Sequence, residues 1–248
     1  MEMPMLNTIR SLGPIDVRNI GRDSLLRWMA FIPFLFALLF RTLVPWAREG
    51  ILTELGFDLQ PYYILLMSFG LIESSPVMFG VVIGFLLLDE RDDQTIKALQ
   101  VTPMTLNNYL SYRVLIPMFI SVVLTLVTYP LAGMVPLAPG KVLLTAVLAA
   151  PLAPLYALFL VIIAKNKVQG FALMKASGSL MLLPIIAYFI PSNWQFAFGF
   201  MPTFWPAKLY WALQAGESGI WLYLVAGFLV HTFFLWLMAR RFNKIMHQ

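Results

Sequence analysis

The sequence predicts an all-α membrane protein with six transmembrane helices. Of its 248 residues, 60% are apolar and only 12% are charged, whereas soluble domains are roughly 45–50% apolar. The charged residues cluster in short blocks between apolar runs that are too long for the core of a soluble domain. A spanning helix needs about 20 predominantly apolar residues. Six runs meet this requirement: residues 25–46, 61–88, 106–134, 142–164, 173–191 and 219–239.

A short helix on the membrane surface is predicted before the first span, over residues 14–24. The stretch from Asp16 to Arg27 alternates apolar side chains with arginines, a composition typical of interfacial helices. Gly21 and the pair Asp23-Ser24 offer a break and an N-cap for the span that follows. The sequence shows no repeat, and its loops are too short to hold a soluble domain. Residues 1–248 are therefore predicted to form one membrane domain.

The distribution of basic residues predicts the orientation. Of the 17 Lys and Arg residues, 13 fall on the side that holds the N-terminus, the second loop, the fourth loop and the C-terminus. The other side holds Arg41, Arg48, Lys141 and Lys208. Because positive charge is retained on the cytoplasmic side, we expect both termini to be cytoplasmic in a bacterial-type inner (plasma) membrane. Residues 1–24 contain several arginines and no continuous apolar stretch, so no cleavable signal peptide is expected.

Residues 192–216, between the fifth and sixth spans, are too apolar for an exposed loop. They contain Trp194, Trp205 and Trp211 together with Pro202 and Pro206. Tryptophan favours the membrane interface, and broken backbone at membrane depth is tolerated where protein buries it or where it lines a cavity. We therefore predict a short helical pair on the outer side, before the sixth span, that is re-entrant or lies at the interface.

The connection between the second and third spans predicts a short amphipathic cytoplasmic helix. Its acidic residues come first, where they would complement a helix N-terminus, and Ile96 and Leu99 fall on one face. Thr102 and Pro103 then suit the N-cap and first position of the next helix. The alternative is a solvated connector that only caps two helices.

This connection resembles the cytoplasmic element of type-2 ABC exporter permeases. The family pattern has an acidic start, a Thr-Leu-like pair, a leucine, Thr-Pro and then Tyr-Leu-x-x-Arg. The matching residues are Glu90, Thr95-Ile96, Leu99, Thr102-Pro103, Tyr109-Leu110 and Arg113. The usual glycine before the Thr-Leu pair is Gln94 here. Residues 165–170 and 201–206 also resemble drug export permeases of the fluoroquinolone type.

The resemblance implies a multidrug exporter in which this element is the coupling helix that docks in a separate ABC ATPase subunit. The residues it assigns to coupling are Asp89, Glu90, Asp92, Asp93, Thr95, Ile96, Leu99, Thr102 and Pro103. A second permease copy, identical or paralogous, would complete the transporter within the lipid. The chain has no G-x-x-x-x-G-K-[ST] motif, so we expect no catalysis here, no cofactor or metal on this chain, and ATP with Mg on the ATPase partner.

Four residues are candidates for the substrate pathway: Glu73, Ser74, Pro76 and His231. Glu73 lies near mid-bilayer, where a carboxylate is a functional candidate. The other interpretation is that Glu73, Ser74 and Ser75 satisfy the Ile72 carbonyl, whose helical donor Pro76 removes. A lone histidine such as His231 suits an interhelical hydrogen bond at least as well as a relay.

The predicted function is therefore the membrane permease of an ATP-driven exporter of hydrophobic or amphipathic compounds, with substrate identity left open. The alternative is a self-sufficient secondary carrier that uses Glu73 as an ion or proton site, although such carriers favour inverted repeats. A membrane enzyme ranks last, because no paired carboxylates, nucleophile-base pair or metal-spaced cluster is present. The chain has no cysteine, which excludes disulfides and thiolate chemistry. Its basic residues form no stripe suited to nucleic acid.

Overall fold

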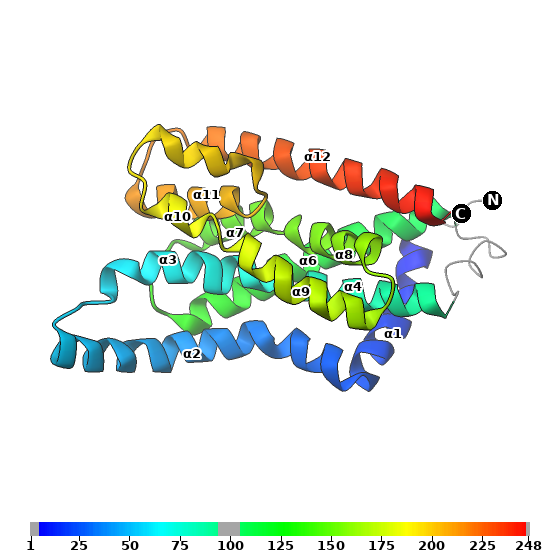
Figure 1. Ribbon diagram of the computed structural model, residues 1–248, viewed down its shortest axis with the longest axis horizontal. Coiled ribbons are helices and arrows are strands. Elements are labelled where there is room, and N and C mark those ends of the chain that lie inside the picture. The colour runs from blue at the N-terminus through cyan, green and yellow to red at the C-terminus, as the bar shows by residue number, and fades with distance from the viewer. Residues whose placement is uncertain (1–4, 94–104, 247–248) are drawn as a thin grey trace.

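A computed structural model describes residues 5–93 and 105–246, and every regular element within these ranges is helical. Six helical segments are long and apolar enough to cross a membrane, which confirms the predicted number of spans. They are Ser24–Leu55, Gln60–Asp92, Asn107–Ala132, Pro139–Ile163, Lys167–Tyr188 and Ile220–Ile245. Figure 1 shows them aligned in one elongated bundle.

The described residues form the following helical elements, of which α1, η3 and α11 lie outside the six spans. They are α1 (Met5–Arg22), α2 (Ser24–Leu55), η1 (Gln60–Tyr62), α3 (Tyr63–Met67), the π-helix η2 (Ser68–Glu73), α4 (Ser74–Asp92), α6 (Leu106–Ala132), α7 (Pro139–Ala149), α8 (Leu152–Ile163), α9 (Lys167–Met181), α10 (Ile185–Tyr188), the 3₁₀-helix η3 (Asn193–Phe200), α11 (Phe204–Ala215) and α12 (Ile220–Met246).

The helix predicted before the first span is present, but it begins at Met5 and continues through Pro14. The predicted N-cap is confirmed, because the Asp23 carboxylate accepts hydrogen bonds from the backbone N–H groups of Leu25 (2.9 Å) and Leu26 (3.2 Å). The chain turns at Asp23, so α1 lies at an angle to α2 (Figure 1). Leu12 of α1 and Phe242 of α12 belong to one buried cluster. Figure 1 shows α1 and the end of α12 at the same end of the bundle.

The first span is longer than the predicted run. The 32 residues of α2 extend about 48 Å at 1.5 Å per residue, beyond a bilayer core of about 30 Å. The helix ends where Gly56 adopts a left-handed φ of 63°. Arg48 in its last turns donates to both oxygens of Asp58, at 2.6 and 3.1 Å. The hydrogen bond from Arg48 and that from the Gln60 backbone hold the pKa of Asp58 below its ordinary value.

The second and fourth spans pack against each other in the centre of the bundle. A Cβ placed on Gly84 would lie 2.8 Å from Leu160 Cδ1 and 3.3 Å from Ala157 Cα, and one on Gly80 would meet the Ala153 carbonyl. Neither glycine can be enlarged without separating α4 from α8, because those distances are shorter than van der Waals contact. The close approach fixes α4, whose last turn begins the polar network described below.

Candidate functional site

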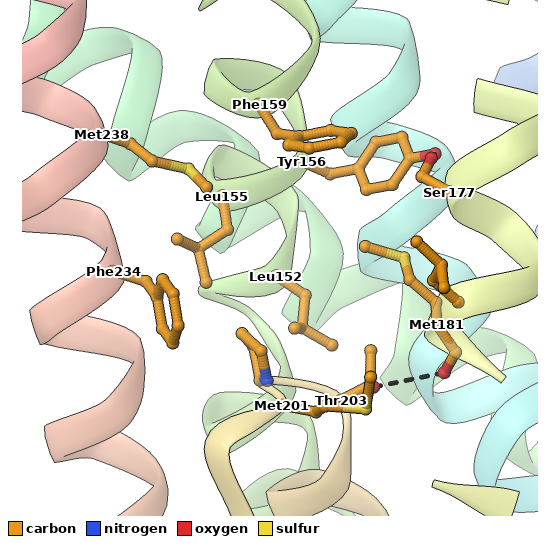
Figure 2. A pocket seen from close by; sticks show the side chains of 12 residues that line it. Leu152, Leu155, Tyr156, Phe159, Ser177, Met181, Met201, Thr203, Phe234 and Met238 are labelled. Atoms are coloured by element: carbon orange, nitrogen blue, oxygen red, sulfur yellow. Dashed lines mark hydrogen bonds between the residues drawn. The ribbon is translucent and has the colours of Figure 1, made fainter. Parts of the chain in front are cut away.

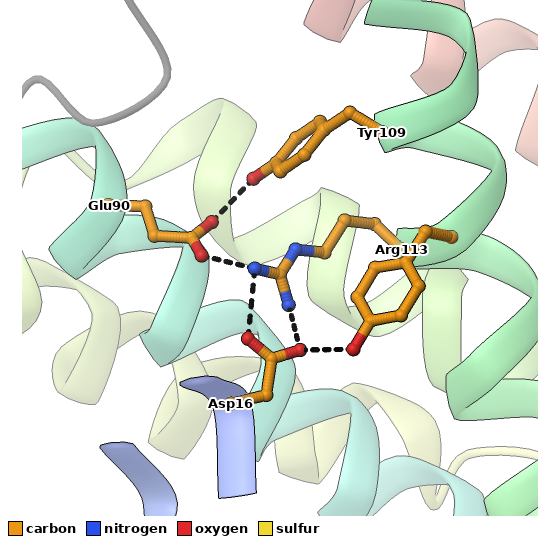
Figure 3. A network of polar contacts seen from close by, with 5 residues as sticks. Asp16, Glu90, Tyr109 and Arg113 are labelled. Carbon is orange, nitrogen blue, oxygen red and sulfur yellow. Dashed lines mark hydrogen bonds and ion pairs between the residues drawn. The ribbon is translucent and has the colours of Figure 1, made fainter. Parts of the chain in front are cut away.

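A buried polar network joins the ends of α4 and α6 to α1 (Figure 3). Arg113 of α6 lies between two carboxylates: its guanidinium donates to Asp16 of α1 at 2.7 and 3.2 Å and to Glu90 of α4. Tyr109 donates to Glu90 at 2.5 Å, and Tyr112 donates to Asp16 at 2.7 Å. Segment 94–104 connects α4 to α6, so the network holds both ends of that connection.

The network is costly to disturb because its central cation is buried. The Arg113 side chain is 1% exposed, and the side chains of Asp16 and Glu90 are about one-tenth exposed. A planar guanidinium can serve two carboxylates at once, which a lysine ammonium does less well. Removing one member would leave charge buried without compensation. The network therefore makes α1, α4 and α6 one mechanical unit at this end of the bundle.

The acidic residues predicted to start a coupling helix belong instead to the end of α4, which extends to Asp92. The prediction that they complement the N-terminus of a following helix falls on residues outside those described. At a helix C-terminus the dipole disfavours negative charge, and the structure compensates with cations. Glu90 pairs with Arg113, Asp89 pairs with Lys167 at 2.8 Å, and Asp92 lies 3.9 Å from Arg91. Asp93 is the C-cap residue that follows α4.

Lys167, at the start of α9, bridges two other elements at the same end of the bundle. Its ammonium lies 2.8 Å from Asp23 and 2.8 Å from Asp89. Partial burial of Asp23 acts to raise its pKa, but the hydrogen bonds from Lys167 and from the Leu26 backbone outweigh it and hold that pKa below its ordinary value. This half-exposed cluster ties α9 to the α1–α2 junction and to α4.

The remaining coupling candidates, Thr95, Ile96, Leu99, Thr102 and Pro103, lie outside the described residues. The first described helix after them, α6, uses Thr105 as its N-cap, whose hydroxyl accepts from the Asn108 backbone at 3.2 Å. Within residues 5–93 and 105–246, no group of three His, Asp or Glu side chains could hold a metal ion.

A cavity of about 210 Å³ lies between α8, α9, α12 and the turn before α11 (Figure 2). Met181, Met201 and Met238 face it together with the rings of Phe159 and Phe234. Its polar groups are already engaged: Tyr156 and Ser177 share a hydrogen bond of 2.5 Å, and the Thr203 hydroxyl donates to the Met181 carbonyl at 3.2 Å. Flexible methionines and aromatic faces suit apolar ligands of variable shape.

The turn formed by residues 201–203 reaches the middle of the spans, because it lines the same cavity as residues from the middle of α8 and α12. His231 of α12 fixes it, since its Nε2 lies 2.9 Å from the Pro202 carbonyl oxygen. None of the four pathway candidates lines this cavity, but His231 holds Pro202, which does. Its hydrogen bond runs from α12 to the turn before α11, so the structural alternative of a hydrogen bond fits, although the partner is a turn and not a helix.

Glu73 lies elsewhere, at the end of the π-helix η2, and does not line the cavity. It is 4% exposed, and among the described residues its Oε1 has no hydrogen-bond partner. Ser74 donates to the Gly70 and Leu71 carbonyls, and Ser75 donates to Leu71. The two serine hydroxyls therefore bond to the Gly70 and Leu71 carbonyls and not to the predicted acceptor, the Ile72 carbonyl.

Sequence reasoning missed Asp16, Tyr112 and the bridging role of Lys167. Asp16 and Arg113 are 97 residues apart, so no local pattern joins them. One signal was present: Asp16 is the single acidic residue among the basic and apolar residues of α1. A lone acid on a helix next to a membrane is expected to have a cationic partner.

Comparison with known proteins gives one consistent family. Residues 16–239 match the model of the family described as "Fluoroquinolones export permease protein Rv2686c-like". Two relatives from Mycobacterium tuberculosis are each 35% identical over 240 residues, covering 95% of this chain and 94% of the relative. They are fluoroquinolones export permease protein MT2760 of strain CDC 1551 / Oshkosh and fluoroquinolones export permease protein Rv2686c of strain ATCC 25618 / H37Rv. No solved structure matches. With its six spans, the chain is a multi-pass membrane protein that belongs to the Rv2686c-like family of fluoroquinolones export permeases.

Proposed function

We propose that this chain is the membrane subunit of an ATP-driven exporter that moves fluoroquinolones or related amphipathic drugs out of the cytoplasm. The substrate class comes from the names of the two mycobacterial relatives. The observation that carries the mechanism is the buried network of Asp16, Glu90 and Arg113 at both ends of segment 94–104. A force applied to that segment would move α1, α4 and α6 together.

The energy would come from a separate ABC ATPase subunit that holds ATP and Mg and docks on residues 89–103. The sequence resemblance of this segment to the coupling helix of type-2 exporters supports the docking site. Lys167 supports a path by which motion of segment 89–103 reaches the methionine-lined cavity. It links Asp89 at the end of α4 to α9, and α9 forms one wall of that cavity. A second permease copy, identical or paralogous, completes the proposed transporter.

The cavity at Met181, Met201 and Met238 is the proposed drug site within the bundle. Its volume of about 210 Å³ is below the roughly 300–1,000 Å³ of drug-sized sites. We therefore propose that α9 moves outward from α8 and α12 to admit a drug, and that the ion contacts of Lys167 hold α9 in the closed arrangement described here.

The proposed orientation places both termini and residues 89–113 in the cytoplasm. The 13 basic residues on that side support it. The arrangement in Figure 1 supports it too, because α1 and the end of α12 lie at one end of the bundle.

Purification of the tagged chain from its own membranes tests the coupling proposal. We expect an ATPase to co-purify and to be lost with Leu99→Asp, while insertion and expression persist. Leu55→Asp is the matched control. Leu55 is an exposed leucine at the C-terminal end of α2, which the proposed orientation places on the outer side of the membrane, away from the ATPase. Unchanged ATPase association and drug export in Leu99→Asp would overturn the docking site.

A further inference from the structure

A second cavity, of about 340 Å³, lies at the end of the bundle opposite α1, beside α10 and α11. Figure 1 shows α10 and α11 at that end, with α3 nearby. Residues that line the cavity include Tyr188, Gln195, Lys208, Trp211, Gln214 and Glu217. Unlike the methionine-lined cavity, it brings charged groups of both signs next to large aromatic rings.

Lys208 is a buried cation in this wall, with an incomplete set of partners. Its side chain is 8% exposed. Among the described residues, its hydrogen-bond acceptors are the two oxygens of Glu217, at 3.3 and 3.4 Å. Charge-assisted hydrogen bonds between an ammonium and a carboxylate are ordinarily about 2.7–2.9 Å long. The Tyr223 ring, 5.0 Å from Nζ, adds a cation–π contact, but a buried ammonium remains short of close acceptors.

Glu217 is the exposed member of the pair. Its side chain is 37% exposed, and it also accepts a hydrogen bond from Tyr223 at 3.0 Å. Glu217 can therefore turn toward a ligand cation with little loss of burial, while Lys208 stays in place. The two groups offer a positive and a negative contact at adjacent points of one wall.

Trp211 and Tyr188 form an aromatic surface on the same cavity. Their ring centroids are 5.0 Å apart in an edge-to-face arrangement. Each ring is fixed at its polar atom, since Trp211 Nε1 donates to Ser68 at 3.1 Å and the Tyr188 hydroxyl donates to the Pro61 carbonyl at 3.2 Å. Fixed rings present a face or an edge to a planar aromatic ligand with little loss of entropy.

We infer that this cavity binds planar aromatic zwitterions, with the ligand carboxylate on Lys208, its ring system against Trp211 and Tyr188, and its ammonium on Glu217. Fluoroquinolones that carry a basic amine have this chemistry, so the inference rests on the proposed function and adds a binding site to it. With the proposed orientation, the site faces the outer side of the membrane, where a drug leaves the protein.

Equilibrium dialysis of the full chain in nanodiscs tests this site, with ciprofloxacin, its decarboxylated derivative and its N-acetylated derivative as probes. Wild-type protein should prefer ciprofloxacin over both derivatives. Lys208→Gln should lose the preference over the decarboxylated derivative, an effect of about five- to tenfold in Kd. Glu217→Gln should lose only the preference over the N-acetylated derivative. Because each result is a ratio within one protein sample, a partly unfolded fraction does not imitate it.

Two variants control for charge and folding. Lys141→Gln removes a lysine that does not line the cavity and whose Nζ lies 3.4 Å from the Leu213 carbonyl, and it should keep wild-type ratios. Lys208→Arg keeps the charge, so it should keep the preference for the carboxylate if Lys208→Gln does not fold.

Three outcomes contradict the inference in different ways. Wild-type ratios in folded Lys208→Gln would overturn the site and leave the proposed function intact. Failure of the wild-type protein both to bind and to export ciprofloxacin would overturn the proposed function together with the site. Competition by anionic phospholipid in wild-type protein but not in Lys208→Gln, without any drug discrimination, would assign Lys208 to a lipid phosphate and overturn the site as a drug site.

Discussion

At the scale of single residues, Arg113 can be tested directly because it serves two carboxylates at once. We expect Arg113→Met to destabilise the protein by about 3–5 kcal/mol, since it leaves Asp16 and Glu90 buried without a cation. Thermal unfolding of purified protein in detergent measures the loss. Arg10→Met, which changes an exposed arginine of α1, is the control and should behave like the wild type.

The same network allows a rescue experiment. Neutralising both carboxylates in the Arg113→Met background, with Asp16→Asn and Glu90→Gln, should restore much of the stability because no buried charge is then left alone. It should not restore export, if the network transmits motion from segment 94–104. A triple variant with full export would show that the network only stabilises the fold.

An experiment can also decide whether Glu73 has a structural role or contacts the transported drug. It borders neither cavity described above, and its Oε1 has no partner among the described residues. We therefore expect Glu73→Gln, which keeps shape and hydrogen-bonding capacity, to export cationic and neutral drugs in the wild-type ratio. Export of both classes should be measured side by side. A loss confined to cationic drugs would instead place Glu73 on the pathway or support an ion-coupled carrier.

Much of the fold was predictable from the sequence, but the candidate site was predictable only in part. Hydropathy is a property of a continuous run, so the six spans and the cap at Asp23 could be predicted. The end of α4 could not, because Asp89 and Glu90 continue the helix beyond the apolar run, and their cationic partners Lys167 and Arg113 are distant in the sequence. The pairing of Asp16 with Arg113 depends on tertiary packing, so it cannot be predicted from the sequence around either residue.

At the scale of elements, the apolar segment from η3 to α11 is the least ordinary part of the molecule. The turn at residues 201–203 reaches the middle of the spans. In η3, directly before that turn, the side chains of Trp194 and Phe200 are nevertheless 79% and 66% exposed. Side chains of this kind are stable against lipid and costly in water. The exposed face of η3 should therefore contact the acyl chains.

Spin labels test that expectation. A nitroxide at Phe200→Cys should collide with dissolved oxygen and be shielded from a water-soluble nickel chelate. A label at Ser218→Cys, in the exposed connection before α12, should show the opposite and serves as the control. Because the chain has no cysteine of its own, each label occupies one defined place. Strong collision of the nickel chelate with a label at position 200 would contradict the re-entrant arrangement.

At the scale of the whole molecule, the orientation decides which cavity faces which compartment. Basic residues predict that Asn7 and Gln248 lie in the cytoplasm. Single cysteines at these positions should resist an impermeant thiol reagent in intact cells and react once the membrane is opened. The Ser218→Cys protein should react in intact cells. Labelling of Asn7→Cys from outside would show that the chain has the opposite orientation in the membrane. The Lys208 cavity would then face the cytoplasm and not the outer side.

The glycine contact between α4 and α8 also has a consequence for biosynthesis. Gly80 and Gly84 face Ala153 and Ala157, which the ribosome adds some seventy residues later. Until the fourth span has entered the membrane, the surface of the second span at Gly80 and Gly84 lacks the helix that packs against it. Lipid or an insertion chaperone must cover that surface in the meantime. Chains that stop before residue 139 should therefore remain bound to the insertion machinery and be degraded quickly, whereas chains that extend past residue 163 should be released and persist.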